Sequence, residues 1–75
     1  MKYTTGSKIR FARERLKLLR ERSGLTLEEL AKNINSTKSY TWELENKDKA
    51  PSVLLVYRLA QSLGVDMKFF IIVEK

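Results

Sequence analysis

The chain has 75 residues, enough for one domain but not for a catalytic domain beside a substrate-binding one. Its composition, 43% apolar and 32% charged, is typical of a globular domain rather than a disordered tail. Cysteine and histidine are both absent, which excludes disulfides, thiolate metal sites and an imidazole general base. We therefore expect no enzyme, no metal site and no cofactor.

The net charge of +6 lies entirely in the first third of the chain. Residues 1–22 carry eight basic and two acidic side chains, whereas residues 23–75 carry seven of each. This asymmetry predicts a polyanionic partner, double-stranded DNA before a membrane, although a solvated basic helix face is the alternative.

The sequence predicts neither a membrane-spanning segment nor a signal peptide. The longest apolar runs, Val53–Tyr57 and Phe69–Val73, have five residues each, and about 20 are needed to span a bilayer. The N-terminus lacks the apolar stretch of a signal peptide. We expect a soluble cytoplasmic protein, associated with the nucleoid, that binds no membrane and no small-molecule ligand.

The first predicted helix covers residues 7–22. Ser7 is its expected N-cap, and Gly24 follows its end. A helical apolar stripe is formed by Ile9, Ala12, Leu16 and Leu19.

Two shorter helices follow over residues 26–45. Thr26 and Glu29 have the spacing of a capping box at the start of the second helix. After a very short turn, Thr37 is the expected N-cap of a third helix that runs to about Glu45. Two helices joined by so short a turn predict a helix-turn-helix.

The last third predicts a fourth helix, from its N-cap Ser52 to Gly64, and a short fifth helical element over residues 66–69. The β-branched and aromatic segment 69–73 predicts a strand. Because an exposed apolar strand invites aggregation, it must pair with residues 2–4, with a second copy of itself, or with both.

The spacing of these segments resembles the Cro/CI (XRE) family of DNA-binding domains. The resemblance implies an all-α, five-helix, lambda-repressor-like domain over residues 1–75, with a short C-terminal strand. It also implies a sequence-specific transcription regulator, a dimeric repressor on a pseudo-palindromic operator, with helix 37–45 in the major groove. The residues that carry the resemblance are Leu16–Thr26, Leu30-Ala31, Thr37–Asn46, Pro51-Ser52, Leu59-Ala60 and Leu63–Val65.

The resemblance also implies which residues contact DNA. Base contacts are expected from Lys38, Ser39, Trp42 and Glu43. For Trp42 two interpretations stay open, contact with DNA or packing back on Tyr40 or the following connector. Phosphate contacts are expected from Thr26, Leu27, Thr37, Asn46, Lys47, Lys49 and Lys17.

Two positions depart from the family pattern. Leu27 stands where the family usually has a phosphate-clamping Gln, and Lys47 replaces a usual Gly. We expect Lys47 to require a less common backbone conformation. Arg20 and Glu45 occupy positions that in this family often form a partly buried ion pair, which we interpret as structural.

A second apolar pair, Phe11 and Leu18, lies away from the stripe of the first helix and predicts a covered surface. The terminal strands, a dimer mate or a partner protein are the candidate covers. The segment Asp66–Ile71 is also similar, more weakly, to HipB-type antitoxins, whose C-terminal strands pair across a homodimer. The alternative function is therefore an antitoxin-like protein that binds a toxin and autoregulates its operon. The expected dimer or partner surface comprises Phe11, Leu18, Phe69, Phe70, Ile71, Ile72 and Val73.

Overall fold

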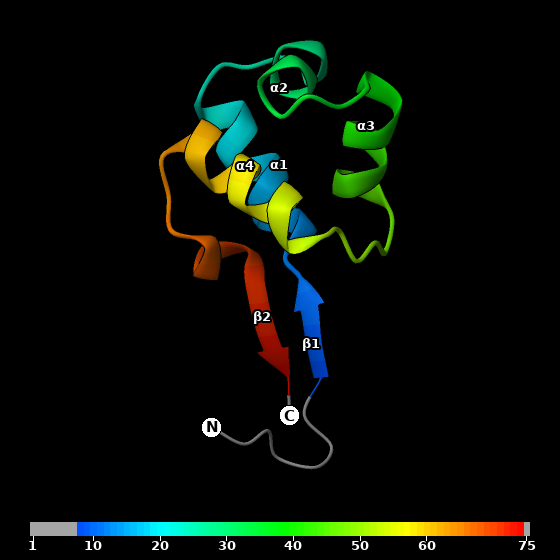
Figure 1. The fold of residues 1–75 in the computed structure, drawn as a ribbon, viewed down its shortest axis with the longest axis vertical. Coiled ribbons are helices and arrows are strands. Elements are labelled where there is room, and N and C mark those ends of the chain that lie inside the picture. The colour runs from blue at the N-terminus through cyan, green and yellow to red at the C-terminus, as the bar shows by residue number, and fades with distance from the viewer. Residues whose placement is uncertain (1–7, 75) are drawn as a thin grey trace.

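The computed structural model describes residues 8–74, which form four α-helices and a two-stranded antiparallel sheet. The sheet projects as a hairpin from one end of the helices, which gives an elongated outline of 39 × 22 × 20 Å (Figure 1). In chain order the elements are β1 (Lys8–Phe11), α1 (Arg13–Arg22), α2 (Leu27–Asn33), α3 (Lys38–Asn46), α4 (Val53–Leu63), the 3-10 turn η1 (Met67–Phe70) and β2 (Ile71–Glu74).

Three helices begin at the predicted N-caps. Thr26, Thr37 and Ser52 each accept a hydrogen bond from the backbone N–H three residues further on. Gly24 and Gly64 have φ of 71° and 70° and reverse the chain after α1 and α4. The limits of α2, α3 and α4 therefore follow from local chemistry that the sequence displays.

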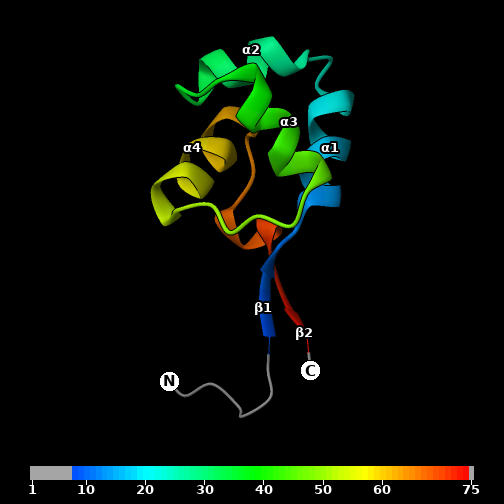
Figure 2. The ribbon, with the colours of Figure 1, turned by 90° about the vertical axis from the view of Figure 1, so that its right-hand side faces the viewer.

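The turn between α2 and α3 depends on Asn35, the one non-glycine residue among residues 8–74 with a positive φ, 55°. Asparagine tolerates this left-handed conformation better than most residues. The Ser36 N–H then donates to Ala31 O at 2.8 Å, which closes the turn and sets α3 across α2. Figure 2, turned so that α3 faces the viewer, shows α2 above it and α4 to one side.

The core lies where the four helices and η1 meet. Its fully buried apolar side chains are Leu16, Leu30, Ile34, Leu44, Leu59 and Phe70. Thr41 is also fully buried, and its hydroxyl donates to Thr37 O at 2.7 Å, so no polar cost remains. No helix in residues 8–74 has the length and apolar character needed to cross a membrane.

The expectation of a single first helix over residues 7–22 is wrong for its first third. Residues 8–11 form β1, and α1 begins only at Arg13. Ile9 is consequently 50% exposed instead of inward-facing. The Ala12 N–H donates to Phe70 O at 2.8 Å, a sheet-type bond that replaces the helical one. The proposed cap Ser7 lies outside the described residues.

The five-helix count is also wrong. The fifth element is the four-residue 3-10 turn η1, which Asp66 caps by accepting the Lys68 N–H at 2.9 Å. Phe69 and Phe70 belong to this turn, so the strand spans 71–74 and not 69–73.

The C-terminal strand pairs within the chain. β2 lies antiparallel to β1, with Phe11 opposite Ile71 and Ile9 opposite Val73. Pairing with the segment 2–4 cannot be described, because these residues lie outside the part that the structure describes. The structural need that the sequence raised, a partner for the strand, is met by residues next to those expected.

Phe11 and Phe70, both expected on a partner surface, are instead buried. Phe11 is 8% exposed, Phe70 is fully buried, and their rings stack with centroids 5.8 Å apart. Phe69 contacts Phe70 edge-on at 5.7 Å, and the Arg15 guanidinium lies 5.3 Å from the Phe69 ring centroid. Their apolar character therefore attaches the hairpin to the helices.

Candidate nucleic-acid interface

The first turns of α3 present side chains outward from a fixed backbone. Thr41 and Leu44 are buried, so helical geometry leaves Lys38, Ser39 and Trp42 exposed on the opposite side. Trp42 is 46% exposed, so about half of its surface is free for contact.

The cap of α3 holds this first turn in place. Thr37 Oγ1 accepts the Tyr40 N–H at 3.0 Å, and Thr37 O accepts the buried hydroxyl of Thr41. Thr37 itself is exposed beside Lys38. A turn tied at both ends can place Lys38 and Ser39 without first ordering the backbone.

Glu43 is half-buried and forms an ion pair with Lys49 at 3.1 Å. This contact joins a predicted base-contact residue to a predicted phosphate-contact residue. An ion pair this exposed adds little stability, so its main effect is to position the 47–52 connector against α3.

The start of the connector resolves one of the family departures. Lys47 caps α3 with its N–H donating to Glu43 O at 2.8 Å, in an extended conformation with φ −123° and ψ 161°. The expected uncommon backbone conformation is therefore wrong, because an extended residue needs no glycine. Asn46 Nδ2 donates to Trp42 O at 2.9 Å, and both Asn46 and Lys47 are exposed.

The start of α2 contains the predicted capping box. Glu29 N–H donates to Thr26 Oγ1 at 3.1 Å, and the Thr26 N–H donates to Glu29 Oε1 at 2.8 Å. The hydrogen bond from the Thr26 backbone lowers the pKa of Glu29. Helix geometry leaves the N–H groups of Leu27 and Glu28 without intrahelical acceptors, while the two glutamates place negative charge nearby.

Arg20 and Glu45 form a two-bonded ion pair beneath α3. Arg20 Nε donates to Glu45 Oε2 at 2.6 Å and Nη2 to Oε1 at 3.1 Å, with side-chain exposures of 13% and 1%. Arg20 Nη1 also donates to Leu25 O at 2.8 Å, and the Glu45 carboxylate raises the pKa of Arg20. The pair connects α1, the α1–α2 turn and α3.

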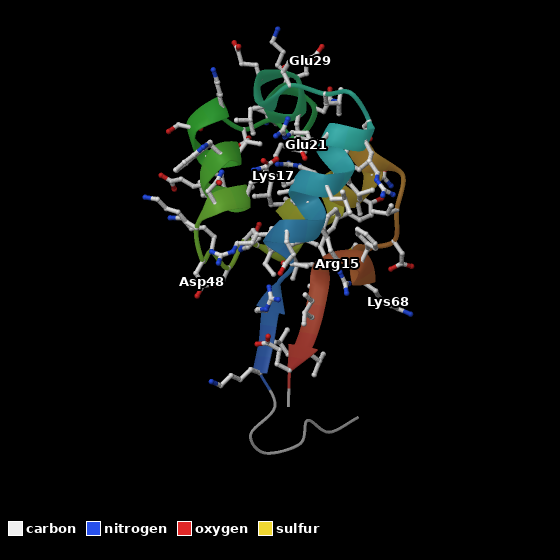
Figure 3. The ribbon with its side chains drawn as sticks, turned by 180° about the vertical axis from the view of Figure 1, so that it is seen from behind. Arg15, Lys17, Glu21, Glu29, Asp48 and Lys68 are labelled. Carbon is white, nitrogen blue, oxygen red and sulfur yellow. The ribbon has the colours of Figure 1, made fainter. Side chains whose placement is uncertain are left out.

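Lys17 stands apart from the other predicted contacts. It is exposed on α1, in the face shown in Figure 3, rather than on α3 or the connector. The structure therefore gathers the predicted contacts on α3 and the connector, with Thr26 and Leu27 at the start of α2 and Lys17 separate.

Four exposed apolar residues were missed at the sequence level. Ile9 was placed in a helical core stripe, and Val53, Leu54 and Tyr57 were not considered for contact, yet they are 50%, 75%, 57% and 48% exposed. A signal existed for the last three. Five consecutive apolar residues in a helix, here 53–57, cannot all face one core.

Comparison with known proteins gives the family. The family model HTH_3, described as helix-turn-helix, matches residues 16–70. No curated protein matches the chain.

Solved structures resemble it over about three quarters of its length. The restriction-modification controller protein C.AhdI from Aeromonas hydrophila is 28% identical, with a TM-score of 0.71 over 76% of this chain and 86% of that one. SinR, the master regulator for biofilm formation, solved in complex with DNA, is 29% identical, with a TM-score of 0.70 over 76% and 92%. The clp gene regulator ClgR from C. glutamicum is 30% identical, with a TM-score of 0.69 over 76% and 74%. With residues 16–70 matched and its helix-turn-helix in place, the chain belongs to the XRE-type helix-turn-helix family of DNA-binding transcription regulators.

Proposed function

We propose that this chain is a sequence-specific repressor that inserts α3 into the major groove of its operator. The observation that carries the proposal is the first part of α3, where Lys38, Ser39 and Trp42 are exposed together. The Thr37 cap and the Arg20–Glu45 ion pair hold that turn in place from two sides.

The side chains on α3 have the chemistry for reading base edges. A lysine donates to guanine O6 or N7, a serine bonds to any base, and a glutamate accepts from cytosine N4. Lys38, Ser39 and Glu43 supply these three groups within two turns of helix. The exposed part of Trp42 offers apolar contact to a thymine methyl group.

Phosphate contacts are proposed for the residues that flank these. Asn46, Lys47 and Lys49 lie together after α3, and Thr37 lies before it. At the start of α2, the contribution of Thr26 and Leu27 is limited to the helix-terminal backbone, because Glu28 and Glu29 oppose an anion there. Lys17 and the other cations of α1 add long-range attraction.

We propose that two copies act on a pseudo-palindromic operator, with half-sites about 34 Å apart. The similar structures support a regulatory role, since their printed descriptions are a controller protein, a master regulator in complex with DNA and a gene regulator. A dimer on promoter DNA represses by occluding the site.

The antitoxin-like alternative has less surface to use than the sequence suggested. Phe11 and Phe70 are buried inside the chain, which leaves Leu18, Ile71 and Val73 exposed from the expected partner surface. One similar structure is a complex of SinR with another protein, SinI. Co-purification of a partner with this chain is the direct check of that alternative.

The experiment is selection from a random duplex library with the purified full chain at physiological salt. We expect enrichment of a palindrome whose half-sites are about 10–11 base pairs apart. Only weak binding that is lost with salt, without any enriched sequence, contradicts the proposal.

A further inference from the structure

Most of the exposed large apolar side chains in residues 8–74 lie on the hairpin or at the start of α4. Trp42 and Leu18 belong to α3 and α1. The other six, which we call the hairpin–α4 surface, are Ile9, Ile71, Val73, Val53, Leu54 and Tyr57, between 39% and 75% exposed.

The hairpin contributes one wholly apolar face. The register pairs Ile9 with Val73 and Phe11 with Ile71, and the alternation of side chains places these four on the same face. Arg10 lies on the opposite face, where it bonds Glu74 at 3.1 Å.

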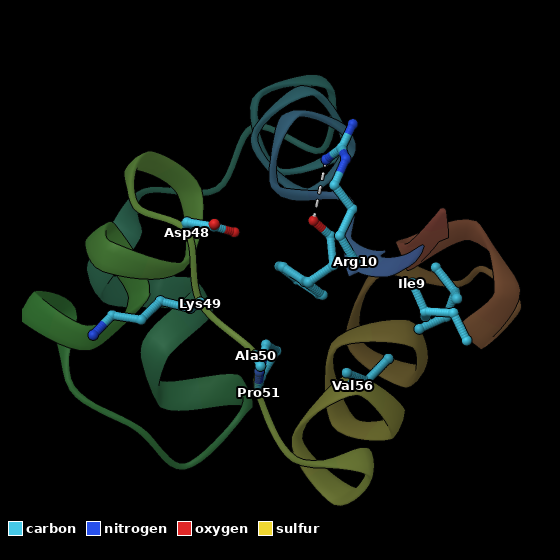
Figure 4. Close-up of a pocket in the computed structure, with 9 residues that line it drawn as sticks. Ile9, Arg10, Asp48, Lys49, Ala50, Pro51 and Val56 are labelled. Atoms are coloured by element: carbon cyan, nitrogen blue, oxygen red, sulfur yellow. Dashed lines mark hydrogen bonds between the residues drawn. The ribbon is translucent and has the colours of Figure 1, made fainter. Parts of the chain in front are cut away.

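That face borders a groove of about 340 Å³. Ile9, Phe11 and Ile71 line one side of it, Val56 of α4 lines another, and the 48–51 connector closes it (Figure 4). Val53 lies three residues before Val56 and four before Tyr57, so helical spacing continues the apolar wall along α4. The hairpin and α4 therefore form one continuous apolar surface.

The hairpin also has unpaired backbone on both edges. The bond from Ala12 N–H to Phe70 O marks that pair as hydrogen-bonded, so the pairs Phe11–Ile71 and Ile9–Val73 are non-hydrogen-bonded. Their backbone groups point away from the partner strand. Exposed apolar strand edges of this kind require a cover.

We propose that a second copy of this chain covers the hairpin–α4 surface, in a contact about a two-fold axis; this rests on the proposed dimeric function. An apolar face is complementary to itself, as a two-fold contact requires. None of its six side chains is charged, so two chains of charge +6 repel each other least where these surfaces meet. The groove rim adds Asp48 and Lys49, one charge of each sign.

Size and position also favour a second copy. A stable dimer buries about 800 Å² on each partner, roughly a seventh of the 5418 Å² surface of the described residues, which is more than a four-residue hairpin face offers alone. In Figure 2, α3 faces the viewer while α4 and the hairpin lie to the side and below. A contact there leaves α3 free and presents two copies of it to the same side, as two half-sites require.

The test is sedimentation equilibrium of the full chain and of three single variants. Val53→Glu and Val73→Glu place a charge on the proposed contact at positions that are 75% and 56% exposed, so both variants fold. Leu18→Glu, at a 45% exposed position on α1, is the matched control. We expect a dimer of about twice 8.8 kDa for the parent and the control. The dimer dissociation constant should rise on the order of 100-fold in the two contact variants.

Three results overturn the proposal: a parent chain that stays monomeric even on the selected operator, contact variants that still dimerise, or monomers caused by Leu18→Glu instead. The proposed function fails separately, if the parent dimer enriches no DNA sequence. A different protein that protects this surface from labelling in place of a second copy also overturns the proposal.

Discussion

At the residue scale, Arg20 and Glu45 decide how α3 is held. The carboxylate of Glu45 is 1% exposed, and its bonds to Arg20 satisfy both of its oxygens. Because Arg20 also bonds Leu25 O, a single guanidinium fixes the position of α3 relative to α1 and the turn after it.

We expect Arg20→Ala to destabilise the fold by about 3 kcal/mol, since it leaves a buried carboxylate without its partner. Urea unfolding of the purified variant measures this loss. The paired replacement Arg20→Met with Glu45→Leu, which removes both charges, should restore most of the stability. A loss below about 1 kcal/mol in the single variant contradicts the structural role that we assign to the pair.

Lys47 separates positioning from base reading. If it contacts phosphate, Lys47→Ala weakens binding to every duplex alike and lowers the slope of log affinity against log salt by about one. Lys68→Ala, at an exposed lysine on η1 (Figure 3), is the control and should leave that slope nearly unchanged. Equal changes in the two variants contradict a contact at Lys47.

At the element scale, the hairpin joins the two ends of the described chain to the helices. Phe70 enters the core from η1 and stacks on Phe11 from β1, so the sheet is attached through one aromatic pair. The helices on their own leave this part of the core open.

We expect Phe70→Ala to cost about 3–5 kcal/mol, a large part of the stability of so small a domain. Phe69→Ala should cost clearly less because Phe69 is only half-buried. Thermal unfolding followed by circular dichroism compares the two variants. Equal losses contradict the view that Phe70 is the anchor of the hairpin.

The junction of β1 and α1 gives a pH dependence. Arg10 bonds both oxygens of Glu14 at 3.0 Å and lowers the pKa of Glu14 from 4.5 to about 2. A pKa lowered by folding adds stability that is complete above about 4.5 and is lost as the pH falls toward 2. Glu14→Gln should lose less stability than the parent between about pH 5 and pH 2 in thermal unfolding. Parallel curves for the two proteins contradict this assignment.

The elements differ in how far the sequence could predict them. The starts of α2, α3 and α4 were predictable because each depends on a cap within three residues. β1 was not, because Ile9, Ala12, Leu16 and Leu19 fit a helical period and the strand partner lies more than 60 residues away. Tertiary pairing overrode the local pattern there.

At the whole-molecule scale, the predicted DNA-contacting residues came mainly from family resemblance, and the structure adds their arrangement. α3 and the connector gather most of them on one side. The hairpin–α4 surface was not predicted, since it depends on β1 and β2 lying beside the start of α4. A basic chain with one polar side for DNA and one apolar side for a second copy is the account that results.

The most direct test of this account compares the DNA sequences selected by the parent chain with those selected by the variant Lys38→Ala with Ser39→Ala. Both positions are exposed on α3, so the variant should keep its helical signal and melting temperature. We predict a palindromic sequence for the parent. The variant should lose discrimination at the contacted bases, by about 1–3 kcal/mol for each good base contact removed. The same sequence enriched equally by both proteins contradicts the assignment of α3 as the element that reads DNA.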